Sequence, residues 1–266
     1  MGWFRRLALA GCAAALAGCG AQSHALRSER STQVAKRAGL GVALVRKASI
    51  PRCAHGVQRL GTTSVAYAAF VRRSVAVSAA PRRGHALRRF GRVDVNGYRV
   101  VFGVLGEVAG RGCRAAWYHV QLPTIPNGAS GWVPASAVRV FRVDSKIVID
   151  LSRRTLAAYR RGRRVLATHV AVGAPATPTP VGRYYVDERF VLTSPDGPFG
   201  PAALGISAHS DVLHDWVQDG PIGIHGTDEP SLIGQAASHG CVRLPNATMR
   251  RLFALAPAGT PVLIRA

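Results

Sequence analysis

Short apolar runs separated by turn residues fill the chain from residue 50 onward, and this pattern limits the possible folds most strongly. Asn96-Gly97 and Pro126-Asn127-Gly128 are among the turn signals that separate the runs. The segment 50–141 is therefore predicted to form a small β-barrel. Its predicted strands are Ser64–Val71, Ser74–Ala79, Tyr98–Leu105, Trp117–Leu122 and Trp132–Val133.

The pattern of strands continues beyond this segment. Lys146–Ser152 alternates between apolar and polar residues, and Thr155–Leu166 follows as a hairpin that turns at Arg161-Gly162. The prolines within Ala174–Val186 forbid a helix there and suit an edge strand or a loop.

One helix is expected near the C-terminus. Asn246 is placed to cap it, and Met249, Leu252 and Phe253 fall on one of its faces. The segment 144–266 is therefore predicted to be a mainly β sandwich with one or two short helices.

The chemistry concentrates in the stretch 221–244, where Cys241 follows His225 by sixteen residues. A cysteine attacks as the thiolate and needs an imidazole nearby, which His225 or His239 can supply. Gly240 leaves the backbone beside the sulfur unobstructed, so two successive amide N–H groups there are candidates to hold an oxyanion. Two other interpretations stay open: a buried structural cysteine, and a zinc site formed by His225, His239 and Cys241.

The complete string resembles the signature of the L,D-transpeptidase (YkuD-type) catalytic domain. That signature is His-Gly followed by Ser/Thr-His-Gly-Cys-x-Arg/Asn, which stands here as His225-Gly226 and Ser238–Arg243. Further recurrent pieces of the family extend the resemblance from about Lys146 to Ile264.

The resemblance implies a peptidoglycan transpeptidase that forms 3→3 cross-links through a cysteine thioester and releases D-alanine. It implies Cys241 as the nucleophile, His225 as the proton donor and acceptor, the Gly226 carbonyl as its orienting group, and the Gly240 backbone in the oxyanion site. It implies neither cofactor nor metal, and it makes carbapenems expected acylating agents. The candidates for substrate contact are Ser238, His239, Arg243, Phe199 and His209.

The N-terminus reads as an export signal. Arg5 and Arg6 precede an apolar run, Leu7–Gly18, that is shorter than the roughly twenty residues a bilayer-spanning helix needs. The end of this run resembles a bacterial lipobox, which implies cleavage before Cys19 and a lipid on its sulfur; an ordinary secretory signal is the alternative. The expected location is therefore the membrane surface, facing the cell wall or periplasm. The predicted organisation is a signal peptide at 1–18, a tether at 19–49, an SH3-like domain at 50–141 and the catalytic domain at 144–266.

The SH3-like assignment rests on Trp117–Val133, which resembles the end of bacterial SH3-like domains that precede L,D-transpeptidase modules. Trp117, Tyr118 and Trp132 are expected to line a peptide groove or to form the barrel core. With Cys19 and Cys241 assigned and Cys12 in the signal, Cys53 and Cys113 form an even pair in an oxidising compartment, so a disulfide is predicted between them.

The net charge of the chain is compatible with other functions. The net charge is +22, which suits nucleic acid, anionic lipid or acidic wall polymers. Scattered arginines and an export signal argue against nucleic acid. A non-catalytic wall-binding lipoprotein and an L,D-carboxypeptidase that uses the same thioester stay as alternatives.

Overall fold

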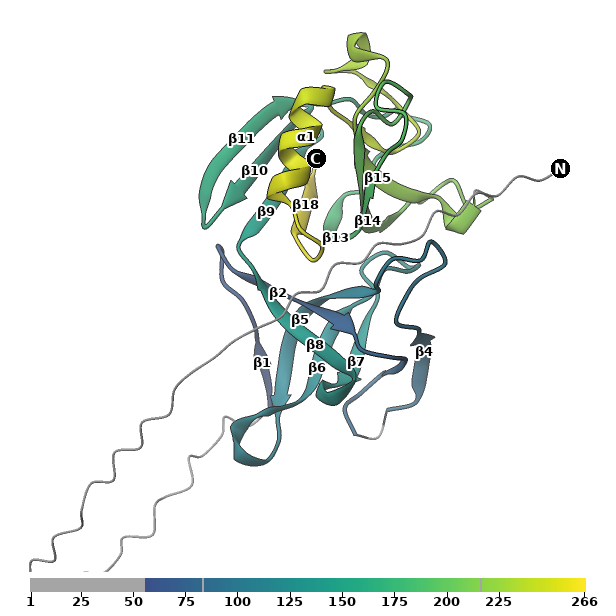
Figure 1. Cartoon of the computed structure of the whole chain (residues 1–266). Coiled ribbons are helices and arrows are strands. Elements are labelled where there is room, and N and C mark those ends of the chain that lie inside the picture. Colours follow the sequence, from purple (N-terminus) through teal and green to yellow (C-terminus); the bar gives the residue numbers. More distant parts are fainter. Residues whose placement is uncertain (1–55, 83, 216) are drawn as a thin grey trace, which may run out of the picture. The chain divides into compact units, whose positions relative to one another are not determined.

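The computed structural model describes residues 56–82, 84–215 and 217–266 (Figure 1). The predicted signal peptide, tether and lipid-bearing Cys19 lie outside these residues, and so does Cys53. Cys113 is disulfide-bonded, but its pairing with Cys53 stays a prediction. Within the described ranges, no helix has the length and apolar character needed to cross a bilayer.

The first half is a β-sheet that curls around its own apolar core. Along the sheet the strands follow the order β4-β3-β7-β6-β5-β2-β8, and β1 pairs with β5. The strands are β1 (Val57–Arg59), β2 (Ala66–Val71), β3 (Val75–Ser78), β4 (Ala86–Phe90), β5 (Val101–Ala109), β6 (Ala115–Gln121), β7 (Ser130–Pro134) and β8 (Val138–Val143). All five predicted strands are therefore present, and β1, β4 and β8 are additions. The SH3-like identity of this segment stays a prediction.

The aromatic residues of this half differ in burial. Trp132 is buried and stacks on the His119 ring, with the centroids 4.9 Å apart. Trp117 and Tyr118 are half-buried on the neighbouring strand β6. Tyr118 packs against the apolar core of this sheet, whereas Trp132 is buried beside His119 and is not part of that core.

The second half contains the sheet that carries the candidate site. Its strands follow the order β11-β10-β9-β18-β13-β14-β15-β17, and β12 pairs separately with β16. The strands are β9 (Ser145–Asp150), β10 (Thr155–Arg160), β11 (Arg163–His169), β12 (Val172–Gly173), β13 (Gly182–Val191), β14 (Ala202–His209), β15 (Pro221–His225), β16 (Ala236–Ser238), β17 (Val242–Arg243) and β18 (Pro261–Arg265). The chain is mainly β, as predicted.

The predicted hairpin between β10 and β11 turns at Arg161-Gly162, and both residues have positive φ, 50° and 78°. A two-residue turn of this kind matches the twist of the strands, and the glycine adopts the left-handed conformation without steric cost. The C-terminal strand β18 then enters the middle of the sheet, parallel to β9.

Helix α1 (Asn246–Leu255) packs Met249 and Leu252, both fully buried, onto this sheet. Burying side chains of this size contributes about 1.5–3 kcal/mol each. The predicted cap is wrong: Pro245 occupies the N-cap position, and the Asn246 side chain makes no capping bond. Its Oδ1 instead accepts the backbone N–H of Thr227.

Candidate active site

The parallel pairing of β15 with β17 brings Cys241 beside His225. Ile224 pairs with Val242 and His225 with Arg243, so Cys241 stands next to Gly223. The Gly223 N–H donates to Cys241 Sγ at 3.4 Å. A β-carbon on Gly223 would lie 3.9 Å from His225 Cδ2 and 4.0 Å from Cys241 Sγ. The thiol and the imidazole therefore meet over a residue that has no side chain.

One hydrogen bond fixes the His225 ring. Nδ1 donates to the Gly226 carbonyl at 2.6 Å, as the resemblance implied. A neutral imidazole with its hydrogen on Nδ1 keeps a lone pair on Nε2, so Nε2 is the nitrogen that can accept a proton. Phe199 covers the ring edge-on, with the centroids 5.0 Å apart.

Burial sets the charge state of His225. Burial is the largest cause that lowers the pKa of the imidazole; together with the opposing Gly226 hydrogen bond and the smaller lowering effect of the Arg243 charge, it brings this pKa to about 4. The ring is 4% exposed, in agreement with this cause. At neutral pH His225 is therefore uncharged.

Burial also raises the pKa of the Cys241 thiol, while the Gly223 N–H and Arg243 act in the opposite direction. The resting site is therefore a neutral thiol beside a neutral imidazole, and not a thiolate–imidazolium pair. In this state an attack by the sulfur would require a base to take its proton, and the neutral His225 ring is placed to do so, which would be general-base catalysis.

The loop before Cys241 is held by Ser238. Its hydroxyl accepts the Gly240 N–H at 3.1 Å and donates to the Cys241 carbonyl at 2.6 Å. Two predictions need correction. Ser238 is 1% exposed and uses its hydroxyl within the loop, so it does not face a substrate. The Gly240 N–H is engaged by Ser238 and is not free to hold an oxyanion.

Gly240 has a different structural role. Its φ is 110°, which favours glycine, and a β-carbon there would lie 2.9 Å from Ile222 Cδ1. The glycine therefore permits the tight turn that presents Cys241.

Two threonines that the sequence reasoning missed hold the same loop. The Thr179 hydroxyl donates to the Gly240 carbonyl and accepts the Gly173 N–H, both at 2.8 Å. The Thr177 hydroxyl donates to the Ser238 carbonyl at 3.0 Å. The only signal was the run of threonines and prolines at 177–180, which predicted the absence of a helix and nothing more.

Replacing Thr179 with valine is expected to lower the free energy of unfolding by about 1–3 kcal/mol, because it leaves two buried backbone groups unpaired at nearly unchanged volume. Urea denaturation of the wild type and the variant measures this difference. Thr168→Val is the matched control, because the hydroxyl of Thr168 makes one bond at the exposed sheet edge. Equal effects of the two substitutions would contradict the bracing role.

Arg243 braces the site from the other side. Its backbone N–H and carbonyl pair with Ala171, each at 2.9 Å. Its Nη1 forms an ion pair with Glu229 at 2.8 Å. Nε is buried and has no hydrogen-bond partner among the residues described. Arg243 therefore braces the loop, and its Nε is the donor left for the predicted substrate contact.

The three remaining candidates for substrate contact lie at different distances from the thiol and the imidazole. Phe199 is 54% exposed and lies against the His225 ring, so it forms a wall of the site. His239 is exposed on the Cys241 loop. His209 pairs with Pro221, at the end of β15 opposite His225, and its backbone bonds to the Asn127 side chain. The structure therefore does not bring His209 to the thiol.

Asn246 is a further residue that the sequence reasoning assigned to another role. Its Oδ1 accepts the Thr227 N–H at 2.8 Å, directly after the His225-Gly226 pair. A β-carbon on Gly226 would collide with this oxygen and lie 2.9 Å from Gly200 Cα. Gly226 is therefore required for close packing as well as for its carbonyl.

Gly223→Ala is expected to fold normally and to lower kcat/KM by about tenfold to a hundredfold. The added methyl stands at ordinary contact distances from its neighbours, but it fills the space over the thiol and displaces an acyl donor from attack geometry. Thermal unfolding and D-alanine release measure the two effects separately. Unchanged kcat/KM would show that the donor does not approach over Gly223.

The described residues hold no group of three or more His, Cys, Asp or Glu side chains arranged to bind a metal ion.

Comparison with known proteins places this site in a family. The L,D-transpeptidase catalytic domain family (YkuD) matches residues 144–264. A Bacillus licheniformis protein named as an L,D-transpeptidase, YkuD, is 38% identical over 45% of this chain and 64% of its own length. The Bacillus subtilis YkuD protein, which carries the same name, is 32% identical over 47% of this chain and 68% of its own length. The chain thus spans less than two thirds of the first relative.

Solved structures include an Enterococcus faecium L,D-transpeptidase with its cysteine changed to serine. It is 28% identical, with a TM-score of 0.35, over 46% of this chain and 49% of that one. Because the family matches residues 144–264 and the Bacillus subtilis relative is 32% identical over 68% of its length, the chain belongs to the L,D-transpeptidase family.

Proposed function

We propose that this protein forms 3→3 cross-links between peptidoglycan stem peptides through a thioester on Cys241. The observation that carries the proposal is the placement of a thiol and an imidazole over Gly223, with Nδ1 of the imidazole fixed by the Gly226 carbonyl so that Nε2 is free to act as the base. A binding module has no need of this arrangement.

In the first step Cys241 Sγ attacks the carbonyl of the third residue of a donor tetrapeptide while His225 Nε2 takes the thiol proton. The C–N bond to D-alanine breaks, and the proton passes from Nε2 to the departing amine. The backbone N–H of Cys241 is the proposed oxyanion donor. Loss of one such donor costs about a hundredfold or more in similar sites.

In the second step the side-chain amine of another stem attacks the thioester. His225 takes a proton from this amine, the C–S bond breaks, and the sulfur leaves with a proton as the thiol. Arg243 Nε is the proposed partner for a substrate carboxylate, and Phe199 is the proposed apolar wall of the donor groove.

The test is incubation of the protein with a purified disaccharide-tetrapeptide, followed by intact-protein mass and analysis of the muropeptides. We expect a tripeptide adduct on Cys241, free D-alanine and 3→3 dimers. Tripeptide without dimers would make the protein a carboxypeptidase, and the absence of both adduct and D-alanine would contradict the catalytic proposal.

We also propose that Cys19 carries a lipid that anchors the exported protein. Cys19→Ala is then expected to release the protein from the membrane fraction or to leave it unprocessed. An unchanged membrane pool that moderate salt removes would instead assign the attachment to exposed charge, which salt screens within about 8–10 Å.

A further inference from the structure

Acidic and basic residues are segregated along the catalytic half of the chain. Eight of the thirteen Asp and Glu residues of the chain lie between residues 187 and 229, and none lies in 151–186 or 230–266. Strands β10 and β11 and helix α1 belong to these two acid-free stretches. The face that they form is therefore strongly positive.

The arginines of this face are largely without acidic partners. Arg160 and Arg161 share the single carboxylate of Asp144, at 3.8 and 3.0 Å. Within the described part of the chain, the remaining four make no ion pair. These four are Arg163 and Arg164 on β11, and Arg250 and Arg251 on α1. All four are exposed, so their guanidinium groups are available to a ligand.

Three neighbouring hollows, linked by shared lining residues, follow one another along a path on this face. The first, of about 290 Å³, lies between β11 and α1 and includes Arg164, Val165 and Arg251 in its lining. The second, of about 510 Å³, shares Val165 with the first and adds Arg160, Arg161 and Arg163. The third, of about 370 Å³, shares Arg161 with the second and adds Arg142 and Asp144.

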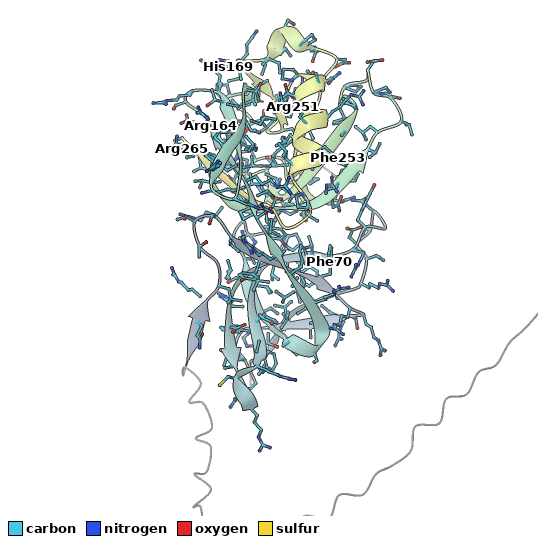
Figure 2. The ribbon with its side chains drawn as sticks, turned by 60° about the vertical axis from the view of Figure 1, so that its left-hand side comes forward. Phe70, Arg164, His169, Arg251, Phe253 and Arg265 are labelled. Atoms are coloured by element: carbon cyan, nitrogen blue, oxygen red, sulfur yellow. The ribbon has the colours of Figure 1, made fainter. Side chains whose placement is uncertain are left out.

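We name this path the arginine groove, and Figure 2 turns its side of the molecule forward. Arg164 and Arg251 are labelled there on the strand and on the helix that border its first hollow. In the sheet, β11 is the end strand opposite β17. The groove arginines are therefore distinct from the residues around Cys241.

We propose that the arginine groove binds a flexible, chain-like polyanion with repeated phosphodiester groups. A guanidinium presents a planar fork that matches phosphate oxygens in pairs. Successive hollows bordered by guanidinium groups suit successive anionic groups along a chain.

A flat anionic bilayer fits the groove less well. Surface-bound proteins bury exposed apolar side chains at the headgroup boundary. On strands β10 and β11 and helix α1, Val165, at 39%, is the sole large aliphatic or aromatic side chain that is strongly exposed. The groove therefore offers charge and a path, but no apolar anchor.

The test uses the full chain and a fluorescently labelled poly(glycerol phosphate), with binding followed by anisotropy over a series of NaCl concentrations. The groove variant is Arg163→Gln, Arg164→Gln, Arg251→Gln. The matched control is Arg59→Gln, Arg89→Gln, Arg139→Gln, which removes the same charge from exposed arginines of the first sheet. We expect the groove variant to bind at least about tenfold more weakly. The slope of the logarithm of its binding constant against the logarithm of the NaCl concentration is expected to be shallower by about 2–3. The control is expected to bind like the wild type.

Two further variants guard against a folding defect. Lysine at the same three groove positions is expected to restore most of the binding, because it keeps the charge. Arg251→Gln alone, on the exposed face of α1, is expected to give a smaller loss with unchanged thermal unfolding. D-alanine release is expected to be equal in all variants, so the outcome does not depend on the transpeptidase proposal.

Equal losses in the groove variant and the control would overturn the proposal, because binding would then follow net charge alone. Co-sedimentation with phosphatidylglycerol vesicles, compared with phosphatidylcholine vesicles, separates the two sources of phosphate. If the groove substitutions abolished vesicle binding and left polymer binding intact, the face would be a lipid-binding surface and the proposal would be wrong.

Discussion

The Cys241→Ala protein is expected to form no acyl-enzyme, to release no D-alanine and to make no 3→3 dimers, with a rate at least about 10⁴-fold below the wild type. The reason is that the sulfur is the atom that becomes bonded to the donor carbonyl, so no neighbouring group replaces it. His225 keeps its bond to Gly226 in this variant, and the loop keeps its bonds from Ser238 and Thr179. The fold is therefore expected to survive, which thermal unfolding measures.

Cys241→Ser is the companion variant, because it keeps the size and the hydrogen-bonding capacity of the side chain but ionises far less readily. It is expected to be nearly as inactive as Cys241→Ala. A carbapenem is expected to add its mass to the wild type and to neither variant, since its strained ring acts as an activated acyl donor. Dimers formed by Cys241→Ala, or a carbapenem adduct on another residue with loss of activity, would show that the nucleophile is wrongly assigned.

The parts of the fold that sequence predicts well are those set by local chemistry. The β10–β11 hairpin needs two successive left-handed residues, and Arg161-Gly162 supplies them within one short stretch. The alternation of Lys146–Ser152 likewise predicts a half-buried strand without knowledge of its neighbours. The parallel entry of β18 beside β9 depends on long-range pairing, so no local pattern indicates it.

The residues of the candidate site also fall into two groups: those that the local sequence motif predicts, and those that depend on long-range pairing. The motif identifies Cys241 and His225 and implies the role of the Gly226 carbonyl. It gives no account of Gly223, which becomes important only because β15 and β17 pair in one register. Thr179 also acts across a large separation in sequence, on a carbonyl sixty-one residues away.

The corrected residues show why residue type alone misleads. Ser238 has a hydroxyl suited to a substrate, but the turn at Gly240 directs it into the loop. Asn246 has a side chain suited to a helix cap, but the backbone of Thr227 lies closer and takes its oxygen. His209 has a side chain suited to substrate contact, yet the register of β14 places it opposite Pro221, at the end of β15 away from His225.

The second large effect is expected at His225. His225→Asn is designed to keep a donor toward the Gly226 carbonyl while removing the base, and kcat/KM is expected to fall by about 10²–10⁴-fold near neutral pH. The residual rate of the variant is expected to rise with pH, because attack then depends on spontaneous ionisation of a thiol whose pKa burial has raised.

The pH profile of the wild type tests the same assignment through the charge of the ring. Because burial lowers the pKa of His225 from 6.5 to about 4, the base stays unprotonated through the mildly acidic range. The acid limb of kcat/KM is therefore expected well below pH 6.5. The lowered pKa also makes stability depend on pH. Between pH 4 and 6.5 the imidazole binds a proton in the unfolded chain but not in the folded chain. The unfolding free energy therefore falls as pH falls from 6.5 toward 4.

This loss of stability amounts to about 3 kcal/mol for His225 alone. Buried carboxyl groups such as Asp187, whose pKa burial raises to about 7, act in the opposite direction. The measurement is therefore the difference in unfolding free energy between the wild type and His225→Asn, obtained by chemical denaturation at a series of pH values. An acid limb of activity near pH 6.5, together with no pH dependence in that difference, would mean that His225 is neither buried as a neutral ring nor poised as the base.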